Sequence, residues 1–315
     1  MPESAGRWSH PSVILVATDL SDLDRLIPFA LKEAAETESR LLLIHVLSAG
    51  AALAVDAAGM PYYDPSSAAD YSAKTLEAWR TIAHEKGIAC DILIRDGNPA
   101  QQIAAAARQF NAGRVLLGTR SRGKVSKLLL GSVAEQVLRS VNLPVMTVGP
   151  EAHLPVQSSL TPRVVLHATT LREASRPSAA LACQIAIAQN ARLVLLHVLP
   201  TPANGKDVAA ELEAAAKTDL AALAEFTGSN EMGCPACIEP RVVHGNPAIE
   251  ILATASELDA SLIVLGATQR SALQNLTRDR TIYRVLAHAR CPVLTLREAA
   301  TAIPEPPETA SLLHF

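Results

Sequence analysis

The sequence of 315 residues contains one long pattern twice. The segment DGNPAQQIAAAARQFNAGRVLLGT, which begins at Asp96, aligns with HGNPAIEILATASELDASLIVLGA, which begins at His244. The same spacing of 148 residues separates Gly118 from Gly266. A period of this length is too long for a solenoid repeat, so the sequence predicts a duplicated domain.

Each copy contains five short runs of apolar residues, separated by segments with helical patterns. In the first copy the runs lie at residues 13–17, 41–47, 92–94, 114–117 and 145–148. Runs that are apolar at every position, without alternation, indicate strands buried on both faces, which is typical of a parallel sheet covered by helices. The sequence therefore predicts an α/β fold with two tandem, doubly wound, Rossmann-like parallel-sheet domains. Their predicted ranges are 1–150 and 151–300, followed by a proline-containing tail at 301–315.

Local signals predict where some of the helices begin. Ser21 and Asp24 form an S-x-x-D capping pattern, although Pro28 implies a later start or a kink. Asn98 and Asn246 each stand directly before a proline. An asparagine N-cap followed by proline at the first helical position is a strong start signal, so both copies are expected to begin a helix there.

Composition excludes several classes of partner. The chain has 28 Lys and Arg against 31 Asp and Glu, a net charge of −3, so nucleic acid is not expected as its main ligand. No apolar run approaches the roughly 18–20 residues of a membrane helix, and the first residues lack the apolar stretch of a signal peptide. Five scattered cysteines fit a reducing compartment better than a disulfide framework. We expect a cytoplasmic protein without a membrane partner.

The stretch GTRSRGKVSKLLLGS, which begins at Gly118, lies between a predicted strand and a predicted helix. It fits the first seven positions of a Walker phosphate loop, but Val125 replaces the required hydroxyl residue. In open parallel sheets, ligands bind beyond the carboxyl ends of the strands, where glycines and free N–H groups at a helix start favour phosphate. Gly131 and Ser132 fit such an anion cradle, and Arg122 adds positive charge. A plain turn with a basic, solvated edge is the alternative.

This loop, the early ATDLSD and the strand LLLIHVL together resemble the universal stress protein family over nearly the whole chain, as two tandem copies. Nucleotide-binding members of that family carry G-x2-G-x9-G-[ST] between the fourth strand and the last helix. Gly118, Gly131 and Ser132 match this motif, while Ser121 replaces its second glycine. The resemblance implies that the first copy binds ATP or a related adenine nucleotide, with Mg²⁺ accompanying the phosphates.

The resemblance also assigns roles to individual residues. Asp19 matches the aspartate that contacts adenosine, and Val46 matches the residue whose backbone lines the adenine pocket. For Asp19 the residues alone leave a second interpretation open, in which its carboxylate only caps the following helix. The residues that would face the phosphates are Gly118, Thr119, Ser121, Gly131, Ser132 and Val133.

The second copy departs from the family motif. Its strand-ending glycine remains, but Gln269, Asp279 and Arg280 replace small residues, and Thr170 stands where the first copy has Asp19. Asp279 would place a carboxylate where a phosphate oxygen belongs, and the two charges would repel each other. We expect the second copy to serve as a structural partner, paired with the first through the last strands as family domains pair in dimers. A homodimer of the whole chain is left open.

Three further features allow more than one interpretation. His45 and His197 lie in matching apolar strands, either as buried rings bonded to backbone or as catalytic bases. Cys234 and Cys237 form a C-x-x-C that is incidental, redox-active or metal-binding. The variable segment 49–65 is compatible with a lid or with an interface.

The functional hypotheses follow from these observations. No Ser-His-Asp order or pair of carboxylates points to one pocket, so we expect binding, with at most slow ATP hydrolysis, rather than an enzyme. The first hypothesis is a stress-response regulatory protein whose first copy binds an adenine nucleotide and whose protein partner is unknown. The second is a nucleotide-free protein-interaction module, and the third is a thiol redox sensor that uses the C-x-x-C pair.

Overall fold

The computed structural model describes residues 8–47, 53–55, 61–63, 65–119, 130–154, 162–201, 206–229, 238–268 and 280–298. The strands of the first half are β1 (Val13–Thr18), β2 (Arg40–Leu47), β5 (Cys90–Asp96), β6 (Arg114–Gly118) and β7 (Val145–Val148). Its helices are α2 (Leu23–Thr37), α3 (Pro65–Glu85), α4 (Pro99–Gln109) and α5 (Ser132–Ser140). A separate hairpin pairs β3 (Leu53–Val55) with β4 (Pro61–Tyr63).

The second half repeats this order. Its strands are β8 (Val164–Ala168), β9 (Arg192–Leu199), β10 (Ile238–His244), β11 (Leu262–Thr268) and β12 (Val293–Glu298). Its helices are the short 3-10 helix η1 (Glu173–Ser175), α6 (Arg176–Ala188), α7 (Lys206–Ser229), α8 (Pro247–Glu257) and α10 (Arg280–His288). The duplication and the strand–helix alternation that the sequence predicts are confirmed.

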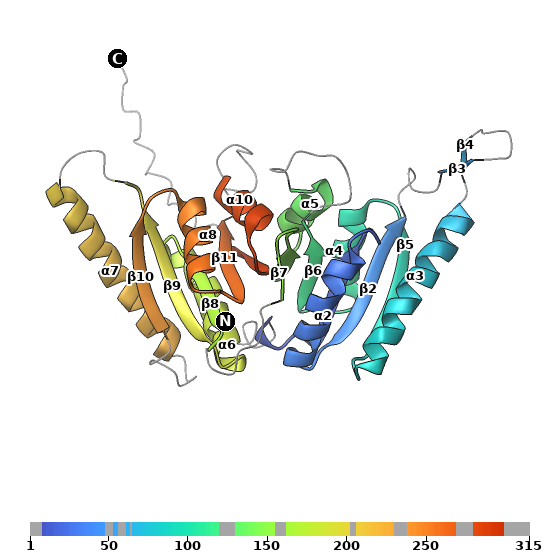
Figure 1. The fold of residues 1–315 in the computed structure, drawn as a ribbon, viewed down its shortest axis with the longest axis horizontal. Helices are drawn as coiled ribbons and strands as arrows, with labels where there is room; N and C mark the ends of the chain where they lie inside the picture. The colour runs from blue at the N-terminus through green and yellow to red at the C-terminus, as the bar shows by residue number, and fades with distance from the viewer. Residues whose placement is uncertain are drawn as a thin grey trace, which may run out of the picture.

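Ten strands form one continuous sheet that passes through both halves, as Figure 1 shows. Their order is β10-β9-β8-β11-β12-β7-β6-β1-β2-β5, and the pairs within each half are parallel. The halves join where β7 pairs antiparallel with β12. The predicted pairing through the last strands is therefore confirmed, and the doubly wound α/β architecture is present in each half.

The joint has nearly two-fold symmetry. Met146 faces Leu294 in the β7–β12 register, and these two residues are also equivalent in the repeat, because they stand 148 residues apart. A pseudo-two-fold axis consequently passes through this pair. Figure 1 shows the result: α5 and α10 lie beside each other at the middle of the molecule, and α3 and α7 form its outer flanks. The β3–β4 hairpin lies at the outer flank beyond α3, away from the joint.

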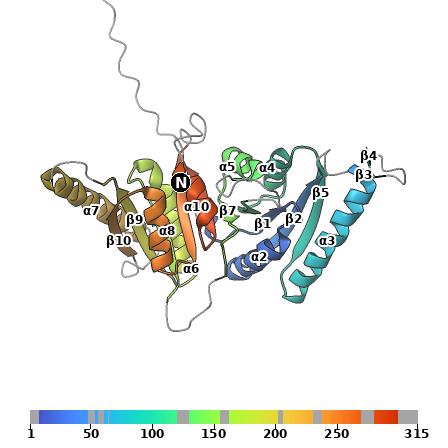
Figure 2. The same cartoon turned by 45° about the horizontal axis from the view of Figure 1, so that its top comes forward.

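Helices cover both faces of the sheet, and the core divides accordingly. One hydrophobic cluster joins α2, α3, α6 and α7 to the same face and continues across both halves. On the opposite face, α4 and α5 pack over the first half, and α8 and α10 pack over the second, each with its own cluster. Figure 2 shows α4 and α5 on one side of the first-half strands and α2 on the other. The central strands are thus buried on both faces, as their continuous apolar runs predict.

The helix starts agree in part with the sequence signals. Asn98 Oδ1 accepts a hydrogen bond from the Gln101 amide at 3.1 Å, and Asn246 Oδ1 accepts from the Ile249 amide at 3.3 Å, so both Asn-Pro predictions are confirmed. The S-x-x-D pattern at Ser21 is wrong by one residue. The N-cap of α2 is Asp22, whose side chain makes no capping bond.

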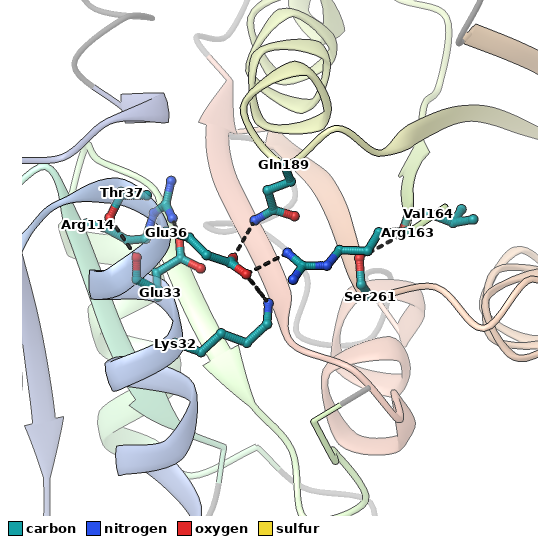
Figure 3. Close-up of polar contacts among 9 residues, drawn as sticks. All are labelled: Lys32, Glu33, Glu36, Thr37, Arg114, Arg163, Val164, Gln189 and Ser261. Carbon is teal, nitrogen blue, oxygen red and sulfur yellow. Dashed lines mark hydrogen bonds and ion pairs between the residues drawn. The ribbon is translucent and has the colours of Figure 1, made fainter. Parts of the chain in front are cut away.

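Side chains from the two halves also meet on the face that carries α2 and α6 (Figure 3). Glu36 in α2 accepts from the Arg163 guanidinium at 2.5 Å and from the Gln189 side-chain amide at 3.2 Å. Lys32, one turn earlier in α2, donates to the same carboxylate at 3.2 Å. Residues of the first half thus hold the start of β8 and the end of α6 in place.

A second set of cross-half contacts lies at the ends of β7 and β12. The Arg297 guanidinium donates to the Arg139 carbonyl oxygen at 2.7 Å and to Asn142 Oδ1 at 3.0 Å. The equivalent residue of the first half is Gly149, where an added Cβ would lie 3.0 Å from the Leu286 carbonyl oxygen. Glycine on one side and arginine on the other make the joint chemically asymmetric despite its symmetric register.

Candidate functional site

A cavity of about 290 Å³ opens at the carboxyl ends of β1, β2 and β6, against the first turn of α5. The strand order changes direction between β1 and β6, which is where doubly wound sheets bind ligands. The structure brings six of the predicted site residues together in the lining of this cavity. They are Asp19, Val46, Gly118, Gly131, Ser132 and Val133.

The lining of the cavity combines aliphatic side chains with the start of a helix. Ile44, Val46 and Ile103 supply aliphatic walls from β2 and α4, while Ser132 and Val133 begin α5 on the other side. The first N–H groups of an α-helix have no intrahelical acceptor and carry the positive end of its dipole. The arrangement can therefore hold a flat apolar group at one end and an anion at the other.

Two backbone amides of the predicted phosphate cradle are already hydrogen-bonded within the protein. The Gly131 amide donates to the Thr119 carbonyl oxygen at 2.8 Å, and the Thr119 amide donates to the Val148 carbonyl oxygen at 3.2 Å. These two amides are used inside the protein, so among the described residues of this loop and helix the first turn of α5 offers the amide donors. Thr119 is buried and is not among the cavity-lining residues. Ser121 and Arg122 lie outside the described residues.

Asp19 lies in a tight turn that both halves share. Its Oδ1 accepts from the Ser21 amide at 2.9 Å and from the Ser21 hydroxyl at 2.6 Å, so it closes the turn as well as lining the cavity. Leu20, the next residue, has φ of 70°, and the equivalent Leu171 has φ of 58°. Non-glycine residues in this left-handed region are uncommon and cluster at functional sites.

Sequence reasoning missed Asp22, which is buried and lines the same cavity. Its carboxylate accepts from the Thr18 hydroxyl at 2.8 Å, and the Arg25 guanidinium lies 3.8 Å away. Burial raises the pKa of this carboxyl from 3.8 to about 6. An added Cβ on Gly118 would collide with the Asp22 carboxylate, so the glycine leaves room for this side chain. The sequence signal that could have found it is the second carboxylate in DLSDLD.

The two strand histidines are structural. His45 Nδ1 lies 2.9 Å from the Thr18 carbonyl oxygen, and His197 Nδ1 lies 2.9 Å from the Thr169 carbonyl oxygen. Each ring thus fastens its strand to the turn that follows the neighbouring strand. The interpretation as buried, backbone-bonded rings is confirmed for His45, whereas His197 makes the same bond but is only half-buried.

The matching edge of the second half carries different chemistry. Thr170, which replaces Asp19, contacts the Ser175 hydroxyl at 3.2 Å. Glu173, the counterpart of Asp22, is exposed, and its carboxylate pairs with the Arg176 guanidinium at 2.7 Å instead of being buried. Arg280 is the first residue of α10, whereas Gln269 and Asp279 lie outside the described residues. Among the described residues, the two halves therefore share a fold but differ in the side chains at this edge.

The cysteines of the described ranges do not form a redox or metal centre. Cys90, Cys183 and Cys291 are buried and unpaired, and burial raises the pKa of Cys90 and Cys291 to about 12, which keeps these thiols protonated. Across the part of the chain that the structure describes, no three His, Cys, Asp or Glu residues gather as metal ligands. Cys234 and Cys237 lie outside that part.

A doubly wound sheet with a small-molecule cavity at its switch point defines the class of α/β ligand-binding proteins. Comparison with known proteins gives the family. The model of the universal stress protein family matches residues 12–149 and again residues 162–297. The chain therefore belongs to the universal stress protein family, in a tandem form.

Individual relatives and solved structures are similar to this chain over different lengths. A universal stress protein of Mycolicibacterium smegmatis is 26% identical over 302 residues, which cover 90% of this chain and 96% of that protein. The crystal structure of a universal stress protein from Archaeoglobus fulgidus is 19% identical, covers 91% of this chain and 98% of its own, and has a TM-score of 0.66. A second structure from that organism, a universal stress protein in complex with dAMP, is 20% identical, covers 44% of this chain and 98% of its own, and has a TM-score of 0.33.

Within the described ranges, no helix is both long and apolar enough to serve as a membrane span.

Proposed function

We propose that the first half binds an adenine nucleotide, ATP or a close relative, and that the protein uses this binding for regulation during stress. The observation that carries the proposal is the cavity at the switch point, which joins Val46 and Asp19 to the first turn of α5. Its volume of about 290 Å³ lies at the lower end of the ~300–1,000 Å³ typical of small-molecule sites. Three residues of the sequence motif that implied this ligand, Gly118, Gly131 and Ser132, line the cavity.

Each end of the cavity suits one part of a nucleotide. The aliphatic residues Ile44, Val46 and Ile103 fit the faces of a purine, and Asp19 offers a carboxylate to hydrogen-bond donors of the nucleoside. The free amides and dipole of α5 fit a phosphate at Ser132 and Val133. The second half would then act as a permanent structural partner, and the unknown protein partner would read the nucleotide-bound state.

One observation favours the nucleotide-free alternative, in which the chain is only an interaction module. Gly131 and Thr119 already use their amides in internal hydrogen bonds, so these two residues of the cradle offer no amide to a phosphate. Both possibilities are decided by the same binding experiment. The redox alternative depends on Cys234 and Cys237, which lie outside the described residues.

Isothermal titration calorimetry with ATP and Mg²⁺ tests the proposal. Ser132→Glu would place a carboxylate at the phosphate end of the cavity, on an exposed side chain where an acidic residue also suits the helix dipole. Gln136→Glu, one turn further along α5 and also exposed, is the matched control. We expect heat for the wild type and for Gln136→Glu and none for Ser132→Glu. No heat for the wild type would favour the nucleotide-free alternative.

A further inference from the structure

We propose that Asp22 makes nucleotide binding in the first half conditional on a divalent cation, so that the phosphates enter only as a magnesium complex. In this arrangement the Asp22 carboxylate would supply an oxygen ligand to the cation that the phosphates bring with them. The inference rests on the proposed function and adds a residue that decides which charged form of the ligand is accepted.

The first step of the argument is the position of the carboxylate. Asp22 occupies the N-cap of α2, where an aspartate ordinarily accepts from the amides of its own helix, but here it makes no capping bond. It turns inward instead, accepts from the Thr18 hydroxyl at 2.8 Å and lines the cavity that Ser132 and Val133 also line. The side chain of Asp22 is 8% exposed.

The second step is the space kept for it. The backbone of Gly118 lies so close to the carboxylate that a Cβ at this position would overlap Oδ2. Gly118 is also the first glycine of the nucleotide motif, at the carboxyl end of β6. Asp22 and the strand end that would meet the ligand are therefore neighbours.

The third step is the balance of charge. Among the described residues, the charged groups near the carboxylate are Arg25, 3.8 Å away on α2, and Asp19, which adds a second negative charge from the turn after β1. β6 and α5 contribute Gly118, Gly131 and Ser132 to the same lining, and these carry no charge. Among these described groups the two carboxylates carry two negative charges and Arg25 carries one positive charge, so a free polyphosphate would meet a net negative charge on this side of the cavity.

A magnesium ion resolves this conflict because it takes oxygen ligands from one or two carboxylates together with substrate phosphates. Asp22 supplies such a carboxylate oxygen. The second half supports the assignment by contrast: its counterpart, Glu173, lies at the surface and pairs with Arg176 at 2.7 Å. The inward carboxylate is found in the half that carries the nucleotide motif.

The test is to measure the ATP dissociation constant by calorimetry, in Mg²⁺ and in EDTA, for the wild type, Asp22→Asn and Asp24→Asn. Asp24 is the matched control because it is an exposed aspartate in the first turn of the same helix. For the wild type and Asp24→Asn, EDTA should weaken binding at least ~10-fold, which corresponds to removing one favourable charge contact. For Asp22→Asn the dissociation constants in EDTA and in Mg²⁺ should differ by no more than about threefold, because uncomplexed ATP is no longer repelled.

Several outcomes would overturn the inference. Two results would disprove the role of Asp22 but not the nucleotide site. Asp22→Asn would lose as much ATP affinity in EDTA as the wild type does, or the wild type would bind ATP equally well in both buffers. Adenosine separates a phosphate role from a ribose role, because its affinity should be unchanged in Asp22→Asn; a loss would make Asp22 a nucleoside contact instead. If no variant binds ATP in either buffer, the proposed function fails as well. Circular dichroism of each variant verifies that it is folded.

Discussion

Arg114 and Glu33 form a buried ion pair in the first half, and the equivalent positions of the second half hold the apolar pair Leu262 and Ile185. The ends of α2 and α6 show which of their residues are equivalent, because the Ala34 and Ala186 carbonyl oxygens each accept a hydrogen bond from the amide five residues later. Arg114 also donates to the Trp8 carbonyl oxygen at 2.6 Å, and burial lowers the pKa of its guanidinium to about 10. One fold thus accommodates a buried charge pair and a hydrophobic pair at the same place.

Breaking this pair on one side should be far more harmful than replacing both sides. Glu33→Ala leaves a buried guanidinium without its carboxylate and should cost about 3–5 kcal/mol of unfolding free energy. The double variant Glu33→Ile with Arg114→Leu copies the second half and should remain within about 1–2 kcal/mol of the wild type. Urea denaturation followed by circular dichroism measures both. Arg40→Ala, which breaks an exposed pair with Asp91, should cost only about 0–1 kcal/mol.

The Glu36 cluster should couple the unfolding of the two halves. Both tryptophans, Trp8 and Trp79, belong to the first half, so fluorescence follows that half while circular dichroism follows the whole chain. Glu36→Ala removes the bonds to Arg163 and Gln189 and should cost about 1–2 kcal/mol.

We expect the fluorescence and circular dichroism transitions to coincide in the wild type and to separate in Glu36→Ala. Glu77→Ala, which breaks a pair within α3, is the control and should keep them together. Coincident transitions in Glu36→Ala would contradict the coupling role of the cluster.

Asp22 should make the protein less stable as pH rises through the weakly acidic range. Its pKa is about 6 in the folded protein and 3.8 ordinarily, so the folded state holds the proton more tightly than the unfolded state. Stability from this group is therefore lost between about pH 4 and pH 6 on going upward. Asp22→Asn should be more stable than the wild type by about 2–3 kcal/mol at pH 7.5, with the difference vanishing below pH 4. Equal urea midpoints of the two proteins at pH 7.5 would contradict this.

His167 should act in the opposite direction. It is completely buried, and burial lowers its pKa from 6.5 to about 4. The unfolded state then binds the proton more tightly, so this contribution is present above pH 6.5 and is lost as pH falls toward 4. His167→Val introduces the residue found at the equivalent position of the first half, Val16. The loss of unfolding free energy as pH falls toward 4 should be smaller in this variant by up to about 3 kcal/mol. If the unfolding free energy changes between pH 7.5 and pH 4.5 by the same amount in His167→Val as in the wild type, this role is disproved.

Much of the fold could be predicted from the sequence because its signals are local or repeated. The continuous apolar runs gave the buried strands, the Asn-Pro pairs gave two helix starts, and the repeat gave the duplication. The pairing of β7 with β12 came from the family resemblance. The asymmetric contacts of Glu36 and Arg297 were beyond prediction, since each joins residues more than 100 positions apart that no motif marks.

The candidate site was predicted less completely. Six of the predicted site residues meet in one cavity, because the carboxyl ends of neighbouring parallel strands and the start of the helix that follows one of them lie at the same edge of the sheet. The use of the Gly131 amide by Thr119 depends on the path of the chain in three dimensions. The inward turn of Asp22 depends on the space at Gly118, and the capping pattern at Ser21 gave no hint of it.

Native mass spectrometry of the full-length protein in ATP and Mg²⁺ tests the central claim most directly, because it counts ligands per chain. The account predicts one adenine nucleotide per chain for the wild type and for Gln136→Glu, and none for Ser132→Glu. Two nucleotides per chain, none on the wild type, or one retained by Ser132→Glu would contradict a single site in the first half.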